Sequence, residues 1–67
     1  MSAIEMQTHL QELEAERQLA LMEGLGDSAA YMADLDEEIA ATLHAYVVAA
    51  VTEIAVLRAD LSGALEG

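Results

Sequence analysis

The sequence predicts an all-α fold in which a short helix and a long helix pack against each other as a hairpin. Apolar residues recur at spacings of three and four along most of the chain, which is the period of an amphipathic helix. Proline is absent, and after the glycines at 24 and 26 no other glycine occurs before position 63. With 67 residues and no cysteine, the chain is expected to form a single domain, residues 1–67, without disulfide support.

The first helix is expected at about residues 3–23. Ser2 and Glu5 have the spacing of a capping box, in which the serine hydroxyl satisfies a backbone amide of the first turn and the glutamate reaches back. The segment "EGLGDS", residues 23–28, supplies two glycines that can end this helix and an Asp-Ser pair that can cap the next. Residues 24–28 are therefore predicted to form the turn.

The second helix is expected at about residues 29–62, because no glycine or proline interrupts it before Gly63. The segment "DLDE", residues 34–37, has the form of a second capping box, so the first turn of this helix could break and restart at Asp34. Both starting points are compatible with the sequence.

One apolar stripe on each helix is expected to face the other helix. On both helices the stripe follows the spacing of three and four residues that keeps side chains on one face. The expected seam consists of Met6, Leu10, Leu13, Leu21, Ile39, Leu43, Ala50, Ile54, Leu57 and Leu61.

The second helix is also apolar on its other sides between about residues 43 and 57, where alanine and valine dominate. One short helix cannot cover all of these sides, so the hairpin is predicted to pack into an oligomeric bundle or onto a larger assembly. The expected partner face consists of Tyr46, Val48, Ala49, Val51, Ala55, Val56 and Glu53.

The charge of the chain excludes some partners. Its formal net charge is −11, and Arg17 and Arg58 are the two basic residues besides the histidines. Phosphate backbones and anionic lipid surfaces are bound through Lys and Arg, so neither nucleic acid nor an anionic membrane is an expected partner. The N-terminal "MSAIEMQTHL" has no basic segment and no apolar run, so no signal peptide is predicted.

A membrane span is a disfavoured alternative. The segment 39–57 has nineteen residues, close to the ~20 that cross a bilayer. It contains His44 and Glu53, and a carboxylate inside a span costs about 2.5 to 3.5 kcal/mol. A helix covered by protein is therefore the favoured interpretation.

The polar residues do not form a convincing catalytic site. His9 shares one helix face with Glu5, Glu12 and Glu16, which could bind a divalent metal but is more typical of a solvated acidic face. Neither histidine follows a glutamate by three residues, as di-iron helical bundles require. No nucleophile and base pair and no phosphate-binding loop is present, so no enzymatic activity and no cofactor are expected.

Glu53 is expected to take part in an interface rather than in catalysis. An unpaired buried carboxylate is costly, so Glu53 is predicted to pair across the interface with Arg17 or Arg58 of a neighbouring chain.

The C-terminal stretch "AYVVAAVTEIAVLRADLSGALEG", residues 45–67, resembles the tails of short uncharacterised proteins encoded among the virion-assembly genes of actinobacterial phages and prophages. The closest part is "AAVTEIAVLRADLSG", and the resemblance covers about a third of the chain. It implies a minor capsid, decoration or head-to-tail protein that binds copies of itself or a larger capsid-type protein. The implied location is the virion or the host cytoplasm.

The alternative function is an acidic inhibitor or adaptor that binds a basic protein in the manner of a DNA mimic. The net charge favours it, because charge complementarity accelerates association. The acidic residues cluster before residue 39 instead of following one continuous surface, which argues against it.

Overall fold

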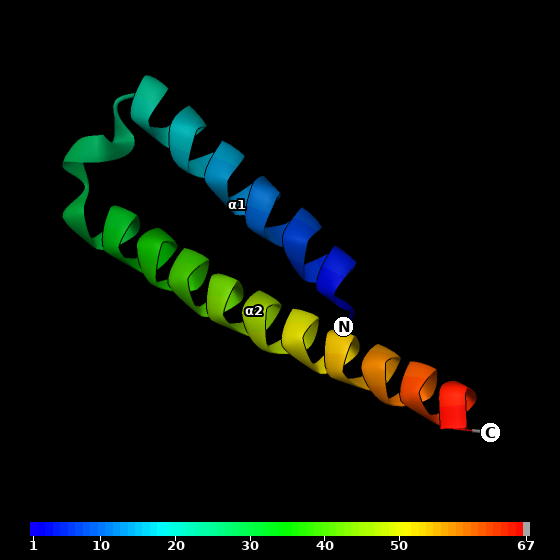
Figure 1. Cartoon of the computed structure of the whole chain (residues 1–67). Helices are drawn as coiled ribbons and strands as arrows, with labels where there is room; N and C mark the ends of the chain where they lie inside the picture. Colours follow the sequence, from blue (N-terminus) through cyan, green and yellow to red (C-terminus); the bar gives the residue numbers. More distant parts are fainter. Residues whose placement is uncertain (67) are drawn as a thin grey trace.

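The computed structural model describes residues 1–66, with side chains as far as Gly63. Its elements are α1 (Ala3–Met22), the short 3-10 helix η1 (Leu25–Asp27) and α2 (Ala29–Glu66). Figure 1 shows α1 and α2 lying antiparallel, with η1 in the connection between them. The all-α hairpin with a short first helix and a long second helix is confirmed.

The start of α1 is stabilised by Ser2, as the capping pattern predicts. The backbone of Ser2 is extended, and its hydroxyl oxygen accepts a hydrogen bond from the backbone N–H of Glu5 at 3.2 Å. The hydroxyl in turn donates to Oε1 of Glu5 at 3.2 Å. These two contacts satisfy a free amide at the helix N-terminus and hold the acidic side chain at the end of the helix dipole where negative charge is favourable.

The turn between the helices depends on Gly24. Its φ of 85° lies in the left-handed region, which glycine adopts without steric cost. The backbone N–H of Ser28 donates to the carbonyl of Leu25 at 2.9 Å, and the Ser28 carbonyl accepts from the N–H of Met32 at 3.0 Å. Ser28 therefore connects η1 to the first turn of α2, and α2 runs through Asp34 without the break that the sequence left open.

The two helices meet along a contact that we call the hairpin interface. Leu13, Ala20 and Leu35 are buried in it. Further positions on both helices are half-buried. They are Ala3, Met6, His9, Leu10 and Arg17 on α1, and Tyr31, Met32, Ile39, Thr42, Ala45, Tyr46, Ala49 and Ala50 on α2.

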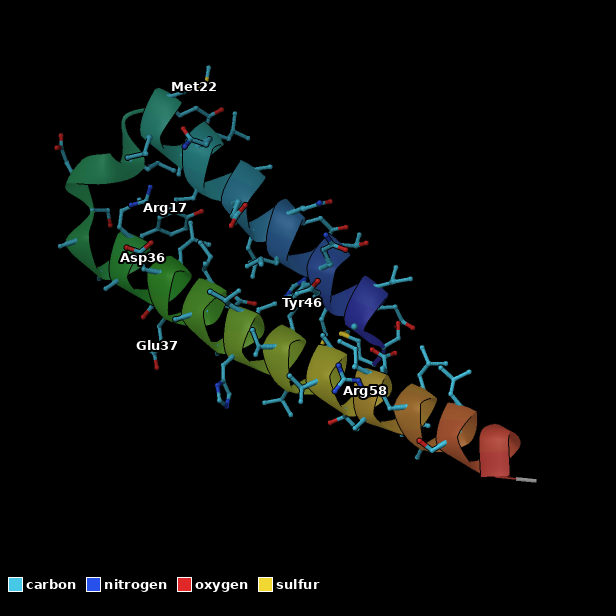
Figure 2. All side chains as sticks on the ribbon, in the orientation of Figure 1. Arg17, Met22, Asp36, Glu37, Tyr46 and Arg58 are labelled. Atoms are coloured by element: carbon cyan, nitrogen blue, oxygen red, sulfur yellow. The ribbon has the colours of Figure 1, made fainter. Side chains whose placement is uncertain are left out.

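Polar contacts link α1 to α2 near the turn. Nε of Arg17 lies 2.8 Å from Oδ1 of Asp36, and Figure 2 shows these two side chains pointing toward each other between the helices. The hydroxyl of Tyr31 donates a hydrogen bond to Oε1 of Glu16 at 3.0 Å. Both contacts are partly solvated, and the Arg17–Asp36 ion pair is expected to contribute about 1 kcal/mol or less.

A third polar contact marks the other end of the hairpin. The backbone N–H of Ala3, the first residue of α1, donates to Oε2 of Glu53 at 3.3 Å. α2 continues beyond this point, so residues 54–63 have no α1 beside them; we call this segment the free end. Figure 1 shows the N-terminus beside α2 well before the end of that helix. The molecule measures 60 × 16 × 13 Å. Its radius of gyration is 17.3 Å, whereas a compact chain of this length has a radius of gyration of about 11 Å.

Candidate functional site

Half of the expected seam lies in the hairpin interface. Leu13 is buried, and Met6, Leu10, Ile39 and Ala50 are half-buried. The other half lies outside this interface. The exposed members of the expected seam are Leu21, Leu43, Ile54, Leu57 and Leu61.

The length of α1 explains why three of these assignments are wrong. Ile54, Leu57 and Leu61 are 53, 58 and 56% exposed because they lie in the free end, past the point where Ala3 meets Glu53. No residue of α1 is available there to cover them.

The assignments of Leu21 and Leu43 to the seam are wrong for local reasons. Leu21 is 43% exposed and lies against the turn, where its Cδ2 atom is 3.0 Å from the position that a Cβ on Gly26 would occupy. Leu43 is 48% exposed because α1 packs on the neighbouring stripe of α2, which contains the half-buried Thr42.

The neighbouring stripe is built around residues that lie outside the expected seam. Leu35 is buried, and Thr42 and Ala49 follow it at intervals of seven residues, on the same face of α2. Ala49 was assigned to the expected partner face, and this assignment is wrong because Ala49 is half-buried on the side of α1. The seven-residue spacing was a usable signal, although a threonine and an alanine gave it little hydrophobic weight.

An apolar stripe about a quarter of a turn away remains uncovered by α1. We call it the outer stripe: Leu43, Val47, Ala50, Ile54, Leu57 and Leu61. All of its members except Ala50 are exposed, and their spacing alternates between four and three residues. A shallow groove beside it is lined by Val51, Ile54, Ala55 and Arg58.

The remaining members of the expected partner face are distributed around α2. Val48, Val51 and Val56 are 51, 61 and 56% exposed, and Ala55 is exposed as well. Tyr46 is half-buried and belongs to the edge of the hairpin interface. These positions leave α2 apolar on several sides where no part of the described chain covers it.

Glu53 makes a contact within the chain that differs from its expected pairing with a neighbouring chain. It accepts the hydrogen bond from Ala3, so its negative charge lies at the N-terminus of α1, where the helix dipole favours it. Arg17, one of its two expected partners from a neighbouring chain, pairs within the chain with Asp36. Among the side chains described through Gly63, none forms an ion pair with Arg58.

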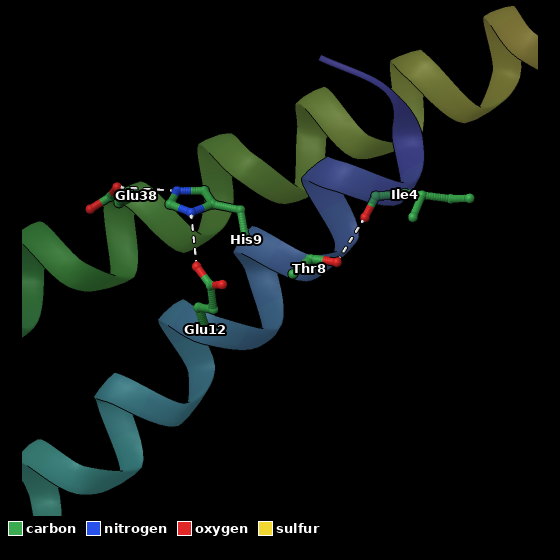
Figure 3. Close-up of polar contacts among 5 residues, drawn as sticks. All are labelled: Ile4, Thr8, His9, Glu12 and Glu38. Atoms are coloured by element: carbon green, nitrogen blue, oxygen red, sulfur yellow. Dashed lines mark hydrogen bonds and ion pairs between the residues drawn. The ribbon is translucent and has the colours of Figure 1, made fainter.

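His9 lies between carboxylates of both helices (Figure 3). Its Nε2 atom is 3.5 Å from Oε1 of Glu38, and its Nδ1 atom is 3.9 Å from Oε2 of Glu12. Its carboxylate neighbours within 4.0 Å are thus Glu12 and Glu38, and Glu5 and Glu16 are not among them. Within the described residues, no group of three or more His, Asp and Glu side chains has the geometry of a metal site.

Tyr31 is the residue whose acidity is clearly altered. The hydrogen bond to Glu16 raises the pKa of the Tyr31 phenol above its ordinary value of 10.0, with smaller contributions from desolvation and from the negative charges of Glu16 and Glu23. A phenol with a raised pKa stays neutral at physiological pH. The contact therefore acts as a structural link and offers no base or nucleophile.

Length and hydropathy alone would allow α2 to cross a membrane. The stretch Ala29–Gly63 contains an 18-residue window with a mean hydropathy of 1.7, and none of that window is buried in the structure. A helix that another protein covers would have the same property. The observation therefore shows an uncovered apolar surface without identifying what covers it.

No protein-family model, curated protein or solved structure matches the chain. Its function is therefore inferred from its own geometry and chemistry.

Proposed function

We propose that this protein is a non-enzymatic structural or assembly protein that binds other protein through the apolar surface of α2. Its proposed setting is phage virion assembly, as a minor capsid, decoration or head-to-tail component. The exposed apolar surface of the free end and the outer stripe is the observation that carries the proposal.

The total surface of the chain supports a partner of ordinary size. The accessible area is 5021 Å², whereas a compact monomer of 7.1 kDa exposes about 4100 Å². In a standard protein interface each partner buries about 800 Å², which is close to the excess of about 900 Å². One additional protein surface along α2 would therefore bring the burial of this chain to the normal level.

The small core of the hairpin supports the same conclusion. Leu13, Ala20 and Leu35 are the only apolar residues buried in the described part of the chain. Single chains below about 70 to 80 residues rarely gain more than about 3 to 5 kcal/mol from one core. Each large apolar side chain that becomes fully buried adds about 1.5 to 3 kcal/mol, so covering the outer stripe would contribute as much as the hairpin itself.

The virion setting is supported by the place of the resemblance in the fold. The segment 45–67, which resembles tails of virion-assembly-region proteins, includes the whole free end. The part of the chain that is most similar to those proteins is thus the part that most needs a partner.

The binding function is tested by size-exclusion chromatography with light scattering on the purified chain, at several concentrations. We expect a defined oligomer, or material that becomes soluble only when co-expressed with the proteins of neighbouring genes. A soluble, cooperatively folded monomer in plain buffer that binds none of these proteins would contradict the proposal. The virion setting is tested separately by the genomic neighbourhood, where capsid, portal or tail genes are expected.

Membrane insertion through α2 is the second candidate, because no residue in the apolar window of α2 is fully buried. Glu53 would lie within such a span, and Arg58 would be the only basic residue near its end. Recovery of the folded chain only in detergent, even after co-expression with neighbouring gene products, would favour insertion over protein binding.

A further inference from the structure

The outer stripe has the heptad pattern of a two-stranded coiled coil. With the heptad positions labelled a to g, Val47, Ile54 and Leu61 occupy position a. Leu43, Ala50 and Leu57 occupy position d. This pattern continues over 19 residues, from 43 to 61. All of the a and d residues except Ala50 are exposed in the single chain.

The residue types at these positions favour two parallel strands. β-branched side chains at a combined with leucine at d pack best in a parallel dimer. Val47 and Ile54 are β-branched residues at a, and Leu43 and Leu57 are leucines at d. Toward the N-terminus of α2 the pattern does not extend to residue 36. Asp36 would occupy a d position there, and it is already paired with Arg17 within the chain.

The charges beside the stripe select the same orientation. Glu53 and Asp60 occupy position g, and Arg58 occupies position e. In a parallel pair, each g residue lies beside the e residue five positions further along the other strand, so Glu53 would meet Arg58 of the second copy twice. In an antiparallel pair that packs Ile54 against Leu57, g faces g, and Glu53 would meet Asp60 of the second copy.

The hairpin leaves room for this arrangement. α1 lies about a quarter of a turn away from the outer stripe and begins at Ala3, opposite Glu53. The hydrogen bond from Ala3 uses Oε2 of Glu53, so Oε1 can accept from a guanidinium group of a second copy. Arg58 has no ion pair with any side chain described through Gly63.

We propose that a second copy of this chain binds to the outer stripe as a parallel two-stranded coiled coil over residues 43–61, with two reciprocal Glu53–Arg58 ion pairs. This inference rests on the proposed function, because it identifies the protein that the apolar surface of α2 binds. The excess surface of about 900 Å² is sufficient for one such partner.

Disulfide trapping tests the orientation, since the chain has no cysteine of its own. Ile54→Cys places two thiols in the same layer of a parallel pair, within bonding distance, and is expected to form a covalent dimer almost completely under mild oxidation at low concentration. Thr52→Cys is the matched control, because residue 52 is exposed on the opposite side of α2 and is expected to stay monomeric in reducing-agent-free gels.

The outcomes separate the inference from the function on which it rests. If Ile54→Cys crosslinks only when mixed with Ala50→Cys or Leu57→Cys, the pair is antiparallel and the inference is wrong, but the protein-binding function stands. If none of these combinations crosslinks and the chain is captured by a product of a neighbouring gene, self-association is wrong and the function again stands. If the wild-type chain is a stable monomer and binds none of these products, both fail.

Charge exchange provides an independent measurement. Glu53→Arg is expected to weaken dimerisation about tenfold in a parallel pair, because it faces Arg58 of the second copy, whereas it would strengthen an antiparallel pair by facing Asp60. The double variant Glu53→Arg/Arg58→Glu is expected to recover most of the wild-type affinity. Circular dichroism on each variant verifies that the loss of the Ala3 contact has not unfolded α1, and a strengthened single variant would overturn the inference.

Discussion

The single helix α2 contains two regions that differ in how they are covered. One region faces α1, and we call it the paired region; the other is the free end. The paired region contains Leu35, which is buried together with Leu13 and Ala20 of α1, and it makes the polar contacts that join the helices at both ends. The free end, residues 54–63, has no buried residue although six of its ten positions are apolar. The comparison shows that unequal helix lengths, more than composition, decide which apolar residues this chain can cover by itself.

Charge separates the chain along the same axis. Residues 1–38 contain ten of the thirteen acidic residues and one arginine, for a formal charge of −9, whereas residues 39–67 contain the other three and one arginine, for −2. Binding to a basic protein through the acidic half, as the inhibitor hypothesis requires, would therefore weaken steeply with salt. Binding through the free end would depend on salt only slightly.

The largest effect is expected from making the free end polar. Ile54→Glu/Leu57→Glu is expected to weaken association more than about 100-fold, because both carboxylates would be buried without partners in the complex. Helicity should remain, since neither residue lies in the hairpin interface. Analytical ultracentrifugation measures the effect, and Ala59→Glu, an exposed position away from the outer stripe, is the matched control. Equal loss in both variants would contradict the assignment of the outer stripe.

The paired region is tested by truncating its central leucine. Leu35→Ala is expected to lower the free energy of unfolding by about 2 to 5 kcal/mol, as for other buried leucines. Leu19→Ala removes the same atoms from a side chain that is 54% exposed and should have a much smaller effect. Both are measured by urea denaturation at one fixed protein concentration. Similar losses would show that Leu35 is not part of the core.

The ion pair near the turn should have a smaller effect. Arg17→Gln is expected to cost about 1 kcal/mol or less, because Arg17 and Asp36 are both substantially exposed and solvent screens their attraction. A double-mutant cycle with Asp36→Asn isolates the pairwise energy. The coupling should decrease in 1 M salt, and a salt-independent coupling would indicate packing rather than charge.

The smallest effect concerns the Tyr31 phenol. Because the hydrogen bond to Glu16 raises the pKa of Tyr31, the folded chain retains the proton above pH 10.0, where the unfolded chain releases it. The stabilising contribution is therefore complete below pH 10.0 and is lost as pH rises through the folded pKa. Ultraviolet titration of the wild type and of Tyr31→Phe gives the pKa by difference. Glu16→Gln should lower it toward 10.0, whereas Glu14→Gln should leave it nearly unchanged.

The sequence was sufficient for the fold because its local signals agree with one another. The Ser2 cap and the glycine at position 24 identify the ends of α1, and the absence of proline allows α2 to be long. The face of α2 that α1 covers could not be predicted in the same way. Between about residues 43 and 57 nearly every side of α2 is apolar, so periodicity does not select one stripe over its neighbour. The hydrogen bond from Ala3 to Glu53 shows that a polar contact contributes to that choice.

The contact between Ala3 and Glu53 gives the molecule a built-in reporter. The exchange of the Ala3 amide proton with deuterated solvent depends on how long a side chain of the other helix holds it. Glu53 also borders the surface left open by α1, so occupation of that surface would slow the exchange at a backbone site outside the contact. One amide resonance in an NMR spectrum could then follow both the closing of the hairpin and the arrival of its partner.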